Sequence, residues 1–388
     1  MIRYTEGNEI RLLTGGADYF PALENVIDAA RDEIYLETYI YDGDAAGQRI
    51  ARALSRAARR GVATHLLLDG FGSKALPESL AAEMVAAGVN LLVYRPDIAP
   101  FNLRRSRLRR LHRKLAIVDA NTALVGGINI IDDMHTPGQT PPRVDYAVQV
   151  RGPIVDDIHA AVTRLWVIVC WTQLRRRWRA WTLRCAPNPP AGTQRAAFVI
   201  RDNLGHRRDI EDAYLEAIAG AREEIIIAMA YFLPGARFRH ALAEAVARGV
   251  RVILLLQGRV EYFFLHHASR ALYGSLLDAG IQIQEYHKSF LHAKVAVIDS
   301  YWATVGSSNI DPFSLLMARE ANVVVEDKAF ALELRASLMQ LIERGARSVA
   351  SASWSKQPLL ARVLAWLSYG IFRVSTGVLG YAKEQENG

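Results

Sequence analysis

Apolar positions in this chain fall in short runs that alternate with amphipathic stretches, a pattern typical of strands alternating with helices. Apolar runs predict strands at Ile34–Tyr41 and Val62–Leu68, and the helix between them ends in an Arg-Gly-Val sequence at residues 60–62. The same succession returns in the second half, with predicted strands at Ile225–Phe232 and Val250–Leu256 and a second Arg-Gly-Val at 248–250. The pattern therefore predicts an α/β fold built from an internal repeat.

The boundary between the two repeats is expected near Pro187–Gly192, which is rich in proline and can continue neither a helix nor a central strand. We predict a first half at residues 1–190, a second half at 191–350 and a C-terminal tail at 351–388. The first half also carries an insertion with an arginine run at Arg104–Arg110. This run is either a solvated face or a rim that attracts anions.

The composition is that of a folded protein, with 51% hydrophobic residues, 22% charged residues and a net charge of +7. These values exclude disordered, collagen-like and coiled-coil classes. Two cysteines, Cys170 and Cys185, are too few for a disulfide framework or a thiolate zinc site, which favours a reduced, cytoplasmic setting. No signal peptide is visible at the N-terminus. Only seven of the 47 basic residues are lysines, so a lysine in this chain is a stronger candidate for a specific chemical role than an arginine.

One polar pattern occurs in both halves with the same spacing, His-x-Lys-x4-Asp-x6-Gly-Gly/Ser-x-Asn. Its members are His112, Lys114, Asp119, Gly127 and Asn129 in the first half, and His292, Lys294, Asp299, Ser307 and Asn309 in the second. Each His-x-Lys begins what is predicted to be a strand, where alternation puts His and Lys on one face and Asp on the other. We therefore expect Asp119 and Asp299 to serve loop geometry and the other residues to face a site.

Two imidazoles, two ammonium groups and two amides suit the chemistry of a phosphodiester. One imidazole can attack phosphorus, and the second can donate a proton to the departing alkoxide. The lysines and asparagines can stabilise charge on the non-bridging oxygens, and the small residues Gly127 and Ser307 can let backbone amides approach a phosphate. No carboxylate cluster accompanies the motif, so neither a metal nor another cofactor is predicted. Asp145 and Glu320, which enter apolar strands at matching places, are candidates for orienting the histidines.

The doubled motif resembles that of the phospholipase D superfamily, in which two halves contribute one motif each to a single active site. Further segments, among them Leu36–Ile40, Leu67–Ser73 and Trp302–Pro312, resemble bacterial cardiolipin synthases, most closely the B type that lacks N-terminal transmembrane helices. The resemblance covers nearly the whole chain and weakens after about Ala350. It implies two tandem α/β/α sandwich halves related by a pseudo-twofold axis, with one active site at their interface.

By the same resemblance, His112 is the nucleophile, His292 is the general acid and then base, and Asp145 and Glu320 orient them. One phosphatidylglycerol would form a phosphatidyl-histidine with release of glycerol, and a second would attack it to give cardiolipin. Because the site is nearly symmetric, the two histidine roles could be exchanged. The alternatives are a phospholipase D-type hydrolase, a transphosphatidylase with another acceptor, and a superfamily nuclease that uses the same residues.

Two segments favour lipid over nucleic acid as partner and suggest an anionic membrane surface. The first is Leu165–Trp181, where four tryptophans are interleaved with arginines; it fits either the headgroup region or a core helix with a solvated basic end. The second is the tail, Leu359–Phe372, in which Arg373 would be costly at the centre of a bilayer. The tail therefore either lies in the interface or packs on the protein. We expect peripheral attachment to the cytoplasmic face of the bacterial cell membrane, with the oligomeric state open.

Overall fold

The computed structural model describes residues 2–96, 109–136, 140–173, 187–202, 205–260, 263–311 and 318–350, together with Leu367 and Gly370. Most of the arginine run, the Trp-Arg stretch after Gln173 and nearly all of the tail lie outside the described residues. Among the helices that are described, none is both long and apolar enough to cross a bilayer.

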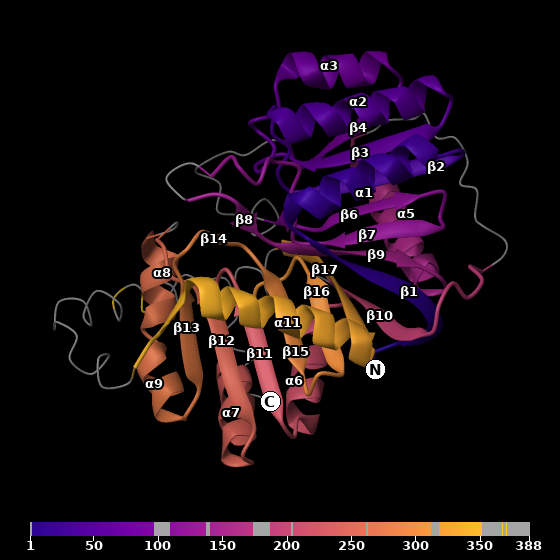
Figure 1. Ribbon diagram of the computed structural model, residues 1–388. Helices are drawn as coiled ribbons and strands as arrows, with labels where there is room; N and C mark the ends of the chain where they lie inside the picture. The colour runs from indigo at the N-terminus through magenta and orange to yellow at the C-terminus, as the bar shows by residue number, and fades with distance from the viewer. Residues whose placement is uncertain are drawn as a thin grey trace.

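The strands of the two halves follow the same order, which confirms the predicted repeat (Figure 1). The first half runs β1 (Thr5–Thr14), β9 (Tyr146–Arg151), β7 (Thr122–Gly126), β6 (Lys114–Val118), β2 (Glu33–Thr38), β3 (Ala63–Asp69) and β4 (Asn90–Tyr94). The second half runs β10 (Gln194–Arg201), β17 (Ala318–Glu326), β16 (Trp302–Gly306), β15 (Lys294–Ile298), β11 (Glu224–Met229), β12 (Arg251–Gln257) and β13 (Gln282–Tyr286), with β18 (Ala346–Ser348) at its edge. Antiparallel pairing of β1 with β10 joins the halves.

Helices cover both halves in corresponding places. The outer face of the first half carries α1 (Gly15–Ala29), α2 (Ala45–Arg59) and α3 (Glu78–Ala86), and that of the second carries α6 (Asp209–Gly220), α7 (Ala236–Ala247), α8 (Phe263–Arg270) and α9 (Tyr273–Asp278). The remaining long helices, α5 (Ile154–Thr172) and α11 (Lys328–Gly345), contribute to a core that contains buried residues of both halves. A hydrogen bond of 2.7 Å between Tyr146 of β9 and Ser337 of α11 also joins the halves. These layers confirm the predicted α/β architecture.

Local sequence explains where several of these elements begin and end. The Asp44 side chain caps α2 by accepting a hydrogen bond from the Gly47 amide at 3.0 Å. Two residues after the ends of α2 and α7 come Gly61 and Gly249, whose φ angles of +91° and +92° are readily adopted by glycine alone. The turn then leads into β3 and β12, which lie where the apolar runs predict them.

The strand predicted to begin at each His-x-Lys is interrupted. The chain pairs first as β5 (Arg110–Leu111) and then as β6, so His112 and Arg113 lie between two strands. The second half repeats the break with β14 (Phe290–Leu291) and β15. Period-two alternation was therefore the wrong reason for grouping His with Lys, because β5 and β14 pair with strands of the opposite half.

Candidate active site

Two short parallel pairings carry the catalytic motif of each half to the other half. The strand β5 pairs with the start of β17, and β14 pairs with β8 (Arg143–Val144). Consequently the His112 amide donates to the Arg319 carbonyl at 3.0 Å, and the His292 amide donates to the Val144 carbonyl at 2.8 Å. Both motifs are thereby held where the halves meet (Figure 1).

The same pairings give each imidazole a carboxylate from the opposite half. His112 Nδ1 lies 3.0 Å from Glu320 Oε2, and His292 Nδ1 lies 2.6 Å from Asp145 Oδ2. Both carboxylates are buried, whereas the imidazoles retain 18% and 15% exposure. A carboxylate on Nδ1 fixes the ring orientation and leaves Nε2 for chemistry. This exchange of partners makes one site out of two motifs.

The two lysines are buried beside the histidines. Lys114 Nζ donates to the His112 carbonyl at 2.7 Å and lies 5.4 Å from the centroid of the Tyr39 ring. Lys294 Nζ donates to the His292 carbonyl and lies 3.6 Å from Asp145 Oδ2. Each lysine therefore places a hydrogen-bond donor beside a histidine, where it can reach an oxyanion.

Burial and mutual charge set the protonation of these groups. Burial lowers the pKa of His112, and Lys114 lowers it further against the opposing effect of Glu320. Burial and then Lys294 lower the pKa of His292 to about 3, and burial lowers the pKa of Lys114 to about 7. Burial alone would raise the pKa of Asp145, but Lys294 and His292 outweigh it and hold the pKa below its usual value. Without substrate, both imidazoles are therefore neutral at pH 7 and both orienting groups are carboxylates; the pKa of Glu320 is likewise lowered, by His112 and Lys114 against burial.

The two asparagines occupy equivalent positions. The Asn129 side-chain oxygen accepts from the Ile40 amide at 3.0 Å, and that of Asn309 accepts from the Tyr231 amide at 3.4 Å. Each contact uses the oxygen of the side chain, so the NH2 group is the end suited to donate to an anion.

Gly127 and Ser307 differ from their predicted role in binding phosphate. Their amides donate to the carbonyls of Tyr146 and Ala321 at 2.9 and 3.0 Å, and the Ser307 hydroxyl donates to Glu320 at 2.5 Å. These donors are committed to the protein, so we do not propose phosphate binding by either residue. A Cβ at Gly127 would lie 2.2 Å from Asp145 Oδ1, which explains why glycine is needed there.

Asp119 and Asp299 directly follow the last residues of β6 and β15, whereas His112 and His292 precede the first residues of the same strands. Asp119 accepts hydrogen bonds from the amides of residues 31–33, and Asp299 accepts from those of residues 222–224, all within 3.3 Å. Both have φ near +51°, a conformation that aspartate tolerates better than most residues. They join the end of one helix to the start of the next strand.

Two features of the site were not predicted from sequence. The Tyr39 ring lies 4.9 Å from the His112 ring, and a buried ion pair joins Arg113 to Glu37 at 2.7 Å. The corresponding second-half residues are Ala230, Ala293 and Ala228, so the repeat itself gave no signal for either feature.

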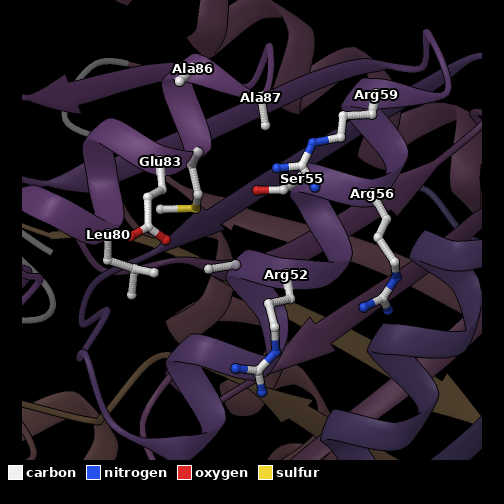
Figure 2. Close-up of a pocket in the computed structure, with 10 residues that line it drawn as sticks. Arg52, Ser55, Arg56, Arg59, Leu80, Glu83, Ala86 and Ala87 are labelled. Carbon is white, nitrogen blue, oxygen red and sulfur yellow. The ribbon is translucent and has the colours of Figure 1, made fainter.

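A separate pocket between α2 and α3 contains none of the predicted site residues. Its lining includes Arg52, Arg56 and Arg59 of α2 and Glu83 of α3 (Figure 2). Arg56 is already paired with Asp28 at 2.6 Å. Elsewhere among the described residues, no three histidine, cysteine or acidic side chains are grouped to hold a metal ion.

Comparison with known proteins gives concordant matches. The family model "Cardiolipin synthase, PLD-like domain" matches residues 23–136 and 214–342. Cardiolipin synthase B of Escherichia coli K12 is 39% identical over 378 residues, covering 97% of this chain and 91% of that protein. The major cardiolipin synthase ClsA of Bacillus subtilis is 33% identical, covering 85% of this chain and 68% of that protein. The crystal structure of phosphatidylserine synthase from Haemophilus influenzae aligns with a TM-score of 0.67 at 12% identity, covering 95% and 94% of the two chains, and so supports the fold.

Proposed function

The chain belongs to the cardiolipin synthases of the phospholipase D superfamily, and on this premise we propose that it transfers a phosphatidyl group from one phosphatidylglycerol to another, releasing glycerol. The observation that carries this proposal is the exchange of carboxylates: Glu320 holds His112 and Asp145 holds His292, with Lys114 and Lys294 buried beside them. Two oriented imidazoles, each beside a buried lysine, suit a two-step transfer through a covalent intermediate.

In the first step, His112 Nε2 attacks the phosphorus of phosphatidylglycerol. The new P–N bond forms as the P–O bond to glycerol breaks, and His292 gives its proton to the departing alkoxide. In the second step, the terminal hydroxyl of another phosphatidylglycerol attacks the phosphatidyl-histidine, and His292 takes up the hydroxyl proton. The P–N bond breaks and cardiolipin leaves, so two phosphatidylglycerols give one cardiolipin and one glycerol.

The charges support this division of labour. A neutral His112 is ready to attack, because only the unprotonated imidazole is a nucleophile. His292 must instead gain a proton before the first step, and the negative phosphodiester provides the reason, since an anion beside the imidazole raises its pKa against burial. Lys114, Lys294, Asn129 and Asn309 then donate to the non-bridging oxygens. Because these groups already stabilise the developing charge, the proposal requires no metal ion.

The test is incubation of the full chain with phosphatidylglycerol in detergent micelles, followed by lipid mass spectrometry. Cardiolipin and glycerol in equal amounts support the proposal, and His112→Ala and His292→Ala should each abolish both products. Phosphatidic acid alone would instead identify a hydrolase. Cleavage of DNA with no lipid product would identify a nuclease.

We also propose that the mouth of the site meets an anionic bilayer, because a phospholipid cannot leave the membrane cheaply with both acyl chains. Phe71, Met134 and Val260 are 47%, 62% and 50% exposed on loops at the edge where the histidines lie. Two cations flank the Phe71 ring, with Lys74 Nζ 5.2 Å and the Arg110 guanidinium 5.1 Å from its centroid. Exposed apolar groups beside cations fit an anionic headgroup layer.

Vesicle co-sedimentation tests this membrane contact. Phe71→Ser and Lys74→Glu should each weaken binding to phosphatidylglycerol vesicles about fivefold. Tyr301→Ser is the matched control, because Tyr301 is 51% exposed at the opposite edge of the sheet. Equal binding by all variants would contradict this surface. Peripheral attachment on the cytoplasmic side stays a prediction.

A further inference from the structure

A small cavity at the end of β12 contains a buried amide that no group among the described residues satisfies. Gln257 is 5% exposed, and neither its Oε1 nor its Nε2 has a hydrogen-bond partner in the part of the chain that the structure describes. A buried amide without partners is costly, so such a group in a folded protein calls for an explanation. The cavity that Gln257 lines has room for a group about the size of a water molecule.

This cavity shares a wall with the active site. The Ala230 amide donates to the Ala293 carbonyl at 3.0 Å, between His292 and Lys294, and the Tyr231 amide donates to Asn309. Ala230 and Tyr231 both line the cavity, together with Gln257 and His266. Residues 230 and 231, which follow β11, therefore separate the cavity that holds the Gln257 amide from the segment that carries His292.

The repeat shows that the unpaired amide is specific to the second half. The residue that ends β3, and so corresponds to Gln257, is Asp69. Asp69 accepts from the amides of Phe71, Gly72 and Leu111 at 2.9, 3.1 and 2.7 Å. In the first half, the side chain at this position thus holds the following loop in place. In the second half, the amide at this position makes no such hydrogen bonds among the described residues.

We propose that Gln257 binds a hydroxyl of the acceptor headgroup, the glycerol end of the phosphatidylglycerol that attacks the intermediate. An alcohol can donate to Oε1 and accept from Nε2, so it satisfies both ends of the amide. His266 adds a neutral imidazole, since burial lowers its pKa to about 4. The acceptor must also reach His292, the group that takes its proton. This inference rests on the proposed function.

The test replaces Gln257 by leucine, which has nearly the same shape and removes the unsatisfied amide, so the variant should fold. The full chain and the variant are incubated with phosphatidylglycerol in micelles, and cardiolipin, phosphatidic acid and glycerol are quantified. We expect glycerol release to continue while the ratio of cardiolipin to phosphatidic acid falls by about tenfold or more. Gln282→Leu, on an exposed position of β13, is the control and should keep the original ratio.

Two results would overturn the inference. An unchanged ratio of cardiolipin to phosphatidic acid, with a higher unfolding temperature, would show that the Gln257 amide only destabilises the fold. Loss of glycerol release together with cardiolipin would place Gln257 in the first step. Failure of the proposed function is a separate result, in which the unaltered chain itself yields no cardiolipin.

Discussion

Replacing Glu320 by glutamine tests whether its charge, and not only its shape, prepares His112 for attack. Glu320 is fully buried, lies 3.0 Å from His112 Nδ1 and accepts the Ser307 hydroxyl at 2.5 Å. Glutamine keeps the size of the side chain but removes the negative charge. It can also turn its NH2 group toward Nδ1, which favours the tautomer with the proton on Nε2, the nitrogen that must attack.

The magnitude follows from the strength of this contact. A hydrogen bond to a charged group contributes about 1.5–3 kcal/mol, and each 1.36 kcal/mol is a tenfold change in rate, so kcat should fall roughly 10- to 150-fold. The pH profile should move as well. Glu320 raises the pKa of His112 against burial and Lys114. Without that charge the pKa falls, and because the nucleophile must be unprotonated, the acidic limb of kcat should move to lower pH.

The assay is initial-rate cardiolipin formation from phosphatidylglycerol in micelles over a range of pH. Glu326→Gln is the matched control, since Glu326 ends the same strand in an ion pair with Arg195 away from the site. Near-normal kcat with an unmoved acidic limb would refute the reasoning. Asp145→Asn should move the alkaline limb to lower pH, because Asp145 raises the pKa of His292. If the two variants moved the opposite limbs, the histidine roles would be exchanged.

Four further predictions test other parts of the site. Lys114→Arg should lower transfer at least about tenfold despite conserving charge, because a guanidinium does not fit the buried contact of 2.7 Å with the His112 carbonyl; near-normal activity would contradict this. Gly127→Ala should cost about 10- to 100-fold in kcat, since its Cβ would displace the Asp145 carboxylate that orients His292, and wild-type rates would show that the carboxylate can move freely. Asp119→Asn should lower the free energy of unfolding by about 1–2 kcal/mol in urea titration while kcat of the folded enzyme stays unchanged; a large loss of kcat would place Asp119 in catalysis. Incubation with EDTA should leave transfer unchanged, whereas inactivation reversed by a divalent cation would show that the lysines are not sufficient.

The sequence by itself determined the local features of this protein. Period and composition predicted the strands β3 and β12, and the repeat of Arg-Gly-Val marked where α2 and α7 end. The repeated motif predicted that His112 and His292 serve the same reaction, because both lie in the same pattern of residues with the same spacing. The family that this motif indicated is confirmed by the comparisons.

Only the tertiary structure decided how the two motifs combine. Glu320 is 208 positions from His112, and Asp145 is 147 from His292, so no local pattern could assign these partners. The assignment follows from the pairing of β5 with β17 and of β14 with β8, which also interrupts the strands that alternation predicted. The tertiary structure also explains why we do not propose phosphate binding by Gly127, since its amide already donates to the Tyr146 carbonyl. Residue type and spacing record which groups are needed, while hydrogen bonds between distant strands decide which of them meet.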